Sequence, residues 1–217
     1  MTKIFGHRGA RGLAPENTVE AIEAGIAHHV DGVEFDVRVT SDGIAVLSHD
    51  PSLAGLVIRK HTYETLKQRK PDLATLDEAL AAVGSRCTLL IEIKPRVPVE
   101  PIVQILREAL AKNTQVDISI LSRSQSTLRQ VKAQLPKVQL VVNERWSVFI
   151  GLWRMRQLGT DRLQMNQRWL GRSILRALQR TGIRVSPYTV NSPKQFARWE
   201  PYVYGIVTDY PDRFEKH

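Results

Sequence analysis

The sequence predicts an α/β protein with a (β/α)8 barrel, also called a TIM barrel, from two features of its 217 residues. Eight short runs rich in β-branched or apolar residues alternate with helical patterns, which is typical of βαβ units around a parallel sheet. Several runs are apolar without a break, as in Leu89-Leu90-Ile91, and such strands are usually covered on both faces. No repeat or Pro/Gly-rich linker divides the chain, so we expect a single domain over residues 1–217.

The runs that we expect to form the barrel strands are spread along the whole chain. They are Lys3–Gly6, Gly32–Val37, Thr88–Ile93, Val116–Leu121, Val138–Val142, Arg162–Met165, Ile183–Tyr188 and Gly205–Thr208. The helical patterns between them cover residues 17–29, 75–83, 99–112, 124–134, 146–158, 170–181 and 193–199.

A ninth run, Ile44–Ser48, lies too close to Gly32–Val37 for a crossover helix, because parallel neighbours need about a dozen connecting residues or more. We therefore expect a short hairpin excursion after strand 2, with Thr40-Ser41-Asp42-Gly43 as its turn. Two helix starts also carry local signals. Asn17 with Glu20, and Thr75 with Glu78, have the spacing of a capping box.

The composition is that of an ordinary folded protein, with 42% hydrophobic and 24% charged residues. No apolar run approaches the roughly 18 residues of a membrane span, and the chain reaches Gly6-His7-Arg8 without the apolar core of a secretory signal. Cys87 is the only cysteine, so nothing in cysteine usage indicates an oxidising compartment. We expect a cytoplasmic protein.

The net charge of +9 is unevenly distributed. Residues 121–199 hold 15 Lys or Arg against only Glu144 and Asp161, a net charge of +13, which leaves −4 for the remainder. Such asymmetry is typical of proteins that meet an anionic substrate, an anionic membrane surface or nucleic acid, and equally of a solvated basic face. The chain has no aromatic platform or recognised motif for nucleic acid, so no nucleic-acid partner is expected. Nothing in the sequence indicates an oligomeric state.

The chemistry lies at the ends of the expected strands. Residues two apart in a strand share a face, so Glu34 projects with Asp36, and Glu92 with Lys94. In a (β/α)8 barrel, functional groups gather at the carboxyl ends of the strands, and His7 follows the first of these strands. We expect these five side chains to converge with that of Arg8.

Three carboxylates inside an apolar barrel repel each other and are costly to desolvate unless positive charge joins them. Oxygen ligands without Cys or clustered His favour one divalent cation, Mg²⁺ or Ca²⁺, with Mn²⁺ as a further candidate. The alternative is an ion-paired cluster in which Lys94, Arg8 and Arg38 neutralise the acids.

Two histidines belong beside this cluster, His7 after the first strand and His49 at the end of the hairpin excursion. A histidine with a pKa near neutrality is suited to general acid or base catalysis. An isolated histidine is more often an ordinary packed or surface residue, but two at barrel-top positions beside three carboxylates favour a catalytic role.

In order and spacing, these motifs resemble those of the glycerophosphodiester phosphodiesterase family. The resemblance rests on His7-Arg8-Gly9, Pro15-Glu16-Asn17-Thr18, Glu34-Phe35-Asp36-Val37, His49-Asp50-Pro51 and Glu92-Ile93-Lys94, and continues in Tyr188-Thr189-Val190-Asn191 and Gly205-Ile206-Val207-Thr208-Asp209. It implies metal-dependent hydrolysis of glycerophosphodiesters to an alcohol and sn-glycerol 3-phosphate. His7 and His49 would be the acid and base, and Glu34, Asp36 and Glu92 the metal ligands. Arg8 and Lys94 would hold the phosphate, and Tyr188 stands where the family has a substrate-facing Trp.

One departure from the family pattern and one feature of composition bear on the substrate. Only about 25 residues separate Pro51 from the helix near Thr75, so we expect a short lid and an open pocket. The segment 145–156 mixes Trp146 and Trp153 with three arginines, a composition that suits a membrane interface or a barrel helix packed on the sheet. We therefore expect a small-molecule or lipid-derived phosphodiester substrate, with peripheral contact with an anionic membrane. Lysophospholipase D-type hydrolysis, or a barrel that binds phosphodiesters without turnover, are the alternatives.

Overall fold

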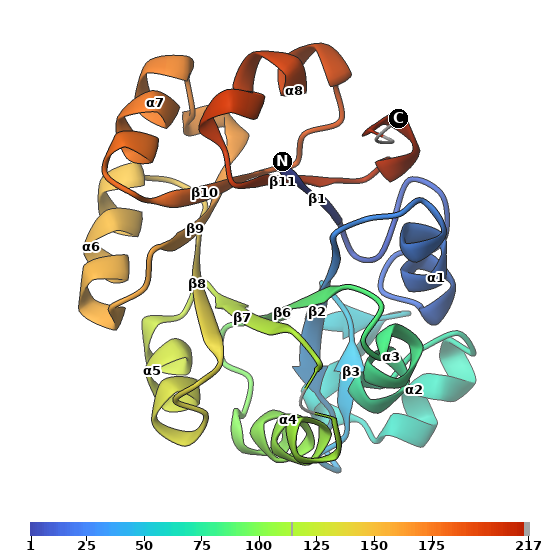
Figure 1. Ribbon diagram of the computed structural model, residues 1–217. Helices are drawn as coiled ribbons and strands as arrows, with labels where there is room; N and C mark the ends of the chain where they lie inside the picture. The colour runs from blue at the N-terminus through green and yellow to red at the C-terminus, as the bar shows by residue number, and fades with distance from the viewer. Residues whose placement is uncertain (114, 215–217) are drawn as a thin grey trace.

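The computed structural model describes residues 1–113 and 115–214, which Figure 1 shows as a closed ring of strands surrounded by helices. β1 pairs in parallel with both β2 and β11, which closes the ring. The predicted (β/α)8 barrel is thereby confirmed. Its eight parallel strands are β1 (Lys3–Gly6), β2 (Gly32–Val39), β6 (Thr88–Ile93), β7 (Ile118–Ser122), β8 (Gln139–Glu144), β9 (Arg162–Asn166), β10 (Arg184–Tyr188) and β11 (Gly205–Thr208).

Helices surround the ring on its outer side (Figure 1). They are α1 (Val19–Ala27), α2 (Tyr63–Arg69), α3 (Leu76–Val83), α4 (Glu100–Lys112), α5 (Gln125–Gln134), α6 (Val148–Leu158), α7 (Arg172–Arg180) and α8 (Pro193–Trp199). Each helix expected from the sequence is present. α2 was not predicted, because it has seven residues and buries only Leu66, which leaves no apolar period to detect.

The hairpin excursion is confirmed. β3 (Ala45–Leu47) runs antiparallel to the end of β2, with Val37–Val39 opposite it. The chain then forms a second small hairpin, β4 (Ser52–Leu53) with β5 (Leu56–Val57), followed by a 3₁₀ turn and α2. This unit covers its own apolar cluster, which consists of Val46, Leu53, Ile58, Leu66 and Leu73.

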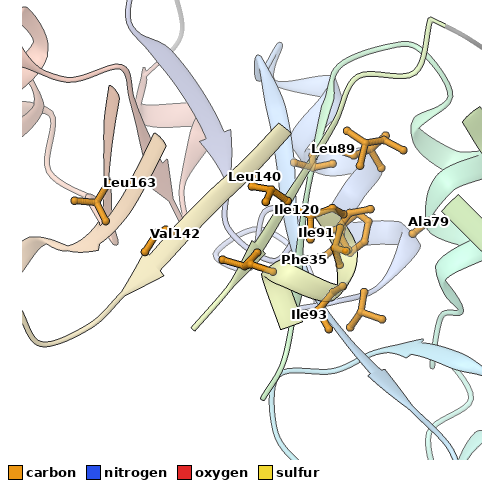
Figure 2. Close-up of a cluster of buried hydrophobic side chains, with 14 of the residues drawn as sticks. Phe35, Ala79, Leu89, Ile91, Ile93, Ile120, Leu140, Val142 and Leu163 are labelled. Atoms are coloured by element: carbon orange, nitrogen blue, oxygen red, sulfur yellow. The ribbon is translucent and has the colours of Figure 1, made fainter. Parts of the chain in front are cut away.

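Successive side chains of each strand point alternately to the outer and the inner face of the barrel, which places core residues on one face and site residues on the other. On β2, Val33, Phe35 and Val37 are fully buried and belong to the main core cluster, which Figure 2 shows between the strands and the helices. Glu34 and Asp36, which alternate with them, face the inside of the barrel. A smaller apolar cluster occupies the inner face, made of Phe5, Leu90, Leu121, Val141 and Val207.

One of the two predicted caps is correct. Thr75 and Glu78 form a full capping box at the start of α3. The capping role expected of Asn17 is wrong, because the hydroxyl of Thr18 accepts the hydrogen bond from the backbone N–H of Ala21 at the start of α1. Asn17 instead contacts Asp36 inside the barrel. Among the described residues, no helix is long and apolar enough to cross a membrane.

Candidate active site

The segment Gly6-His7-Arg8-Gly9 ends β1 in a tight turn at the mouth of the barrel. The φ angle is +51° at Arg8 and +87° at Gly9, a backbone region that L residues rarely adopt. A Cβ atom at Gly9 would lie 2.5 Å from the backbone carbon of Ala21, so glycine is required where the turn packs on α1. The turn lets the backbone N–H of Arg8 donate a hydrogen bond to Oε2 of Glu34 at 3.0 Å.

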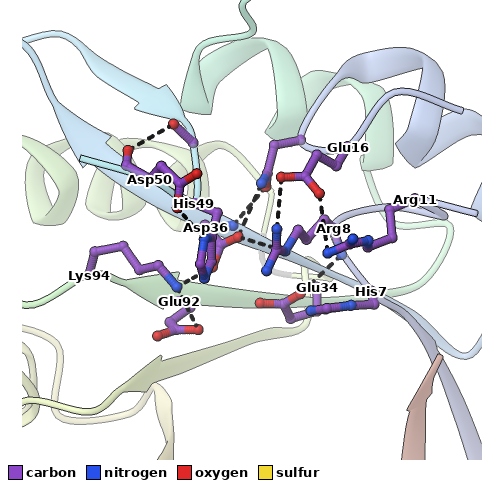
Figure 3. A network of polar contacts seen from close by, with 12 residues as sticks. His7, Arg8, Arg11, Glu16, Glu34, Asp36, His49, Asp50, Glu92 and Lys94 are labelled. Carbon is purple, nitrogen blue, oxygen red and sulfur yellow. Dashed lines mark hydrogen bonds and ion pairs between the residues drawn. The ribbon is translucent and has the colours of Figure 1, made fainter. Parts of the chain in front are cut away.

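Three carboxylates meet inside the barrel, as the strand positions predicted. Asp36 and Glu92 lie directly opposite each other on β2 and β6, and Glu34 is one pleat earlier on β2. One oxygen from each lies within 4.8 Å of the others, and all three side chains are buried. Figure 3 shows the group together with the histidines and cations around it.

Positive charge reaches this acidic cluster unevenly. The Nζ atom of Lys94 lies 2.6 Å from Oδ1 of Asp36 and 3.2 Å from Oε2 of Glu92, and Arg8 Nε lies 3.4 Å from Oδ2 of Asp36. Within the described residues, no Lys or Arg side chain forms an ion pair with Glu34. Arg38, which the ion-paired alternative included, instead donates hydrogen bonds to the carbonyl of His49.

The pKa values of the three acids diverge accordingly. Burial by itself would raise the pKa of Asp36, but Lys94 and Arg8 outweigh it and lower that pKa to about 2. Burial raises the pKa of Glu34 well above its ordinary value, and the neighbouring acids raise it further. Burial also raises the pKa of Glu92, against the opposing charge of Lys94. Two of the three acids therefore lack sufficient positive charge from the protein itself.

The cluster fits a divalent cation. Its donors are all carboxylate oxygens, which Mg²⁺, Ca²⁺ and Mn²⁺ prefer. Oε1 of Glu92 is buried and accepts no hydrogen bond from the described residues. A cation beside Glu34 and Glu92 would meet both deficits, because it supplies the missing charge and a partner for this oxygen.

His7 is oriented by a carboxylate from the other end of the chain. Its Nδ1 lies 2.6 Å from Oδ1 of Asp209, which directly follows β11. Asn191 fixes Asp209 from the other side, since its amide nitrogen donates to Oδ2 of Asp209 at 2.7 Å. Burial would raise the pKa of Asp209, but hydrogen bonds from His7 and Asn191 lower it. With Nδ1 engaged, the Nε2 atom of His7 is left for proton exchange.

His49 reaches the same cavity from the hairpin excursion. Its Nδ1 lies 2.8 Å from Oδ1 of Asp50, and its carbonyl accepts hydrogen bonds from Nε and Nη2 of Arg38 at 3.1 and 2.7 Å. Burial lowers the pKa of His49, and the charge of Lys94 lowers it further. Both effects favour the neutral imidazole, which is the form that accepts a proton.

These groups line one cavity of about 520 Å³ at the carboxyl ends of the strands. Positive side chains outnumber acids in its wall, with Arg8, Arg11, Lys94, Arg123, Arg145 and Arg168 against Glu34, Asp36 and Glu92. Every site residue expected from the sequence lies in this wall, including His7, His49 and Tyr188. The Tyr188 hydroxyl donates to the carbonyl of Glu144 at 3.2 Å, so the residue presents its ring and an accepting oxygen.

The cavity also contains residues that the sequence did not single out as site residues. Asn143 and Gln164 face each other across β8 and β9, and the side-chain oxygen of each is buried without a partner in the described residues. Two further residues lie outside the cavity wall and contact residues in it. Glu16 accepts a hydrogen bond from Arg8 at 2.7 Å and forms an ion pair with Arg11 at 3.2 Å. Asn17 exchanges two 3.0 Å hydrogen bonds with Asp36. For Asn143 and Gln164, their positions on two barrel strands were the available signal.

The fold and the cavity together define a (β/α)8-barrel protein with two histidines, an acidic cluster and surrounding cations in one cavity, a set of groups that suits the hydrolysis of phosphate esters. The model of the glycerophosphoryl diester phosphodiesterase family matches residues 7–213. This chain therefore belongs to that family, an enzyme family of phosphoric diester hydrolases, and the resemblance seen in the sequence is confirmed.

Individual relatives and solved structures align with this chain over nearly their full length. The chain is 29% identical to a glycerophosphodiester phosphodiesterase of Bacillus altitudinis over 240 aligned positions, covering 100% of this chain and 98% of that protein. A glycerophosphodiester phosphodiesterase structure from Thermotoga maritima is 25% identical with a TM-score of 0.82, covering 99% of this chain and 97% of that one. An Oleispira antarctica phosphodiesterase, solved with its product sn-glycerol-3-phosphate, has the same fold at a TM-score of 0.87 and 22% identity, over 98% and 95% of the two chains.

Proposed function

We propose that this protein hydrolyses glycerophosphodiesters to an alcohol and sn-glycerol 3-phosphate, with His7 and His49 as the acid and base. The observation that carries the proposal is the meeting of two carboxylate-oriented histidines with three buried acids and six cations in one cavity. The family assignment supports an enzyme over a barrel that only binds phosphodiesters, and the Oleispira antarctica relative is a phosphodiesterase with this product.

Each chemical demand of phosphodiester cleavage has a candidate residue. The nucleophile must lose a proton and the leaving alcohol must gain one. We assign these two proton transfers to the neutral imidazole of His49 and the Asp209-oriented imidazole of His7. Arg8 and Lys94 line the cavity and would stabilise the negative charge that builds up on the non-bridging oxygens. A divalent cation held by Glu34, Asp36 and Glu92 would supply further positive charge to those oxygens.

The nucleophile is either water or the hydroxyl of the substrate's own glycerol. In the first route a P–O bond to water forms as the P–O bond to the alcohol breaks. In the second route the glycerol hydroxyl displaces the alcohol, and water then opens the resulting cyclic phosphate. Phosphorus NMR during turnover distinguishes them, because only the second route passes through a cyclic phosphate.

Asn143 and Gln164 are suited to hold the glycerol group. Their buried, unpartnered side-chain oxygens need donors, and the hydroxyl groups of glycerol are donors. Tyr188 contributes an aromatic wall on the neighbouring strand β10.

A second candidate activity is lysophospholipase D-type hydrolysis of larger, lipid-derived diesters. No residue between 51 and 75, all of them described, lines the cavity, so the short excursion does not cover it. A mouse lysophospholipase D is 44% identical to this chain over 52 residues, which are 24% of this chain.

The test is hydrolysis of glycerophosphocholine with Mg²⁺, Ca²⁺ or Mn²⁺, followed by lysophosphatidylcholine under the same conditions. We expect His7→Ala and His49→Ala each to abolish hydrolysis while the circular dichroism spectrum is unchanged. His61→Ala is the matched control, because His61 lies outside the cavity and contacts the carbonyl of Val57. Full activity in both active-site variants would overturn the assignment of acid and base.

A further inference from the structure

The outer face of α6 exposes large apolar side chains. Trp146, Phe149, Ile150 and Trp153 are 62%, 82%, 51% and 58% exposed, at the spacing of one side of a helix. The opposite side of α6 is buried through Gly151, Met155 and Leu158. The helix therefore packs on the barrel without using the exposed residues. We call these four residues, Trp146, Phe149, Ile150 and Trp153, the aromatic ridge. Such a patch is typical of an interaction site.

The aromatic ridge begins at the mouth of the cavity. Trp146 follows β8 by two residues, and the preceding Arg145 lines the cavity and stacks on the Trp146 ring at 4.7 Å. The loop after the neighbouring strand β9 repeats this arrangement, with Arg168 in the cavity wall and Trp169 48% exposed beside it. A surface held by the ridge would therefore lie next to the entrance of the site.

Exposed arginines lie on the helix next to the aromatic ridge. α7 lies beside α6 (Figure 1), and its Arg172, Arg176 and Arg180 are all exposed, with Arg172 in contact with Tyr202. With Arg145 and Arg168 they belong to the segment 121–199, whose net charge is +13. Charge of one sign around apolar side chains fits an anionic surface and opposes pairing of this face with a second copy of itself.

We propose that the aromatic ridge docks on an anionic lipid surface and places the mouth of the cavity at that surface. Trp and Arg together are the residues that suit the boundary between lipid headgroups and acyl chains. Docking in this position gives lipid-borne diesters a short path into the cavity. This consequence for the substrate rests on the proposed function, whereas docking itself does not.

The experiment combines vesicle binding with two activity assays. The vesicles are phosphatidylcholine alone or phosphatidylcholine mixed with phosphatidylglycerol, and bound protein is measured by co-sedimentation. We expect binding to the anionic vesicles that Phe149→Ala/Trp153→Ala weakens at least about tenfold, because aromatic insertion is lost. Arg172→Glu/Arg176→Glu should weaken it similarly through charge. Ile44→Ala and Arg69→Glu, on the far side of the barrel, are the matched controls.

Activity separates docking from catalysis. The Phe149→Ala/Trp153→Ala variant should hydrolyse glycerophosphocholine at the wild-type rate. Its rate on lysophosphatidylcholine carried in anionic vesicles should fall at least about tenfold. Absence of binding to anionic vesicles at low salt would overturn the docking proposal. So would a dimer in sedimentation analysis that the ridge substitutions dissociate without any effect on vesicle binding. Inactivity of the wild type on every diester, with vesicle binding intact, would instead refute the proposed function.

Discussion

His7 and Asp209 are 202 positions apart in the chain, yet Nδ1 of the histidine lies 2.6 Å from Oδ1 of the aspartate. Closure of the barrel brings them together, because β1 and β11 are hydrogen-bonded neighbours. Asp209 thereby engages Nδ1 of the imidazole that we propose as catalytic and leaves Nε2 for proton exchange, so its proposed role is that of a positioning residue.

We expect Asp209→Asn to lower kcat on the order of 100-fold with little change in KM, because the amide no longer selects the productive tautomer of His7. His7→Ala should cost more. The double variant should be no slower than His7→Ala alone, since both changes disable one unit. Steady-state kinetics on glycerophosphocholine measures all three, and multiplicative losses would show that Asp209 acts independently of His7.

Removal of the divalent cation should abolish activity. We expect excess EDTA to inactivate the enzyme and Mg²⁺, Ca²⁺ or Mn²⁺ to restore it. Glu92→Gln should raise the metal concentration needed for half-maximal activity by about tenfold or more, because one charged ligand is lost. Calorimetric titration with the metal alone reports binding without turnover. Glu23→Gln on α1, which alters an ion pair with Arg86, should leave both measurements unchanged. Activity in the presence of excess EDTA would contradict the metal assignment.

The Gln164→Leu variant tests whether Gln164 contributes to substrate binding, measured by KM, and not to the stability of the fold, measured by the melting temperature. The buried side-chain oxygen of Gln164 has no partner among the described residues, so an apolar replacement should leave the melting temperature equal or higher. KM for glycerophosphocholine should rise by up to about tenfold, since one hydrogen bond to a glycerol hydroxyl is lost. Thermal unfolding and steady-state kinetics give the two results. A lower melting temperature with unchanged KM would indicate a structural role only.

Arg154 on α6 joins the ends of two barrel strands. Its guanidinium lies 3.2 Å from Oε2 of Glu144 and donates to the carbonyls of Ser122 and Asn143, with both charged side chains buried. Arg154→Met leaves the Glu144 carboxylate without its cation, and we expect the free energy of unfolding to fall by about 3–5 kcal/mol. The exposed Arg156→Met should change it by less than about 0.5 kcal/mol. Urea denaturation of both variants makes the comparison.

The thiol of Cys87 should report on unfolding. Burial raises the pKa of this thiol to about 11. A raised pKa lowers the thiolate fraction at pH 8 to about one molecule in a thousand, compared with about one in ten at the ordinary pKa of 9.0. Labelling with a thiol reagent at pH 8 should therefore be about 100-fold slower in the folded protein than in urea. Equal rates would show that Cys87 is accessible in the fold.

The barrel could be predicted because its signal is local. Uninterrupted apolar runs such as Leu89-Leu90-Ile91 mark strands covered on both faces, and their spacing requires crossovers. The acidic cluster followed from the same logic, since a period of two places Glu34 and Asp36 on one face of β2.

The remainder of the site depends on contacts between distant segments. Asn17 satisfies the local pattern of a helix cap, but a pair of hydrogen bonds to Asp36 takes its side chain into the barrel. Asn143 and Gln164 become neighbours only through the register of β8 and β9. α2 has too few buried residues to leave a period in the sequence.

The two histidines are attached to the barrel in different ways. His7 ends a strand that is paired on both sides, whereas His49 is carried on a chain reversal outside the ring and fastened by Arg38. The excursion also belongs to the packing of the barrel, because Ala45, Leu47 and Ala74 are part of the main core cluster. If His49 has the role that we propose, a change in residues 45–75 would therefore alter proton transfer and core packing together.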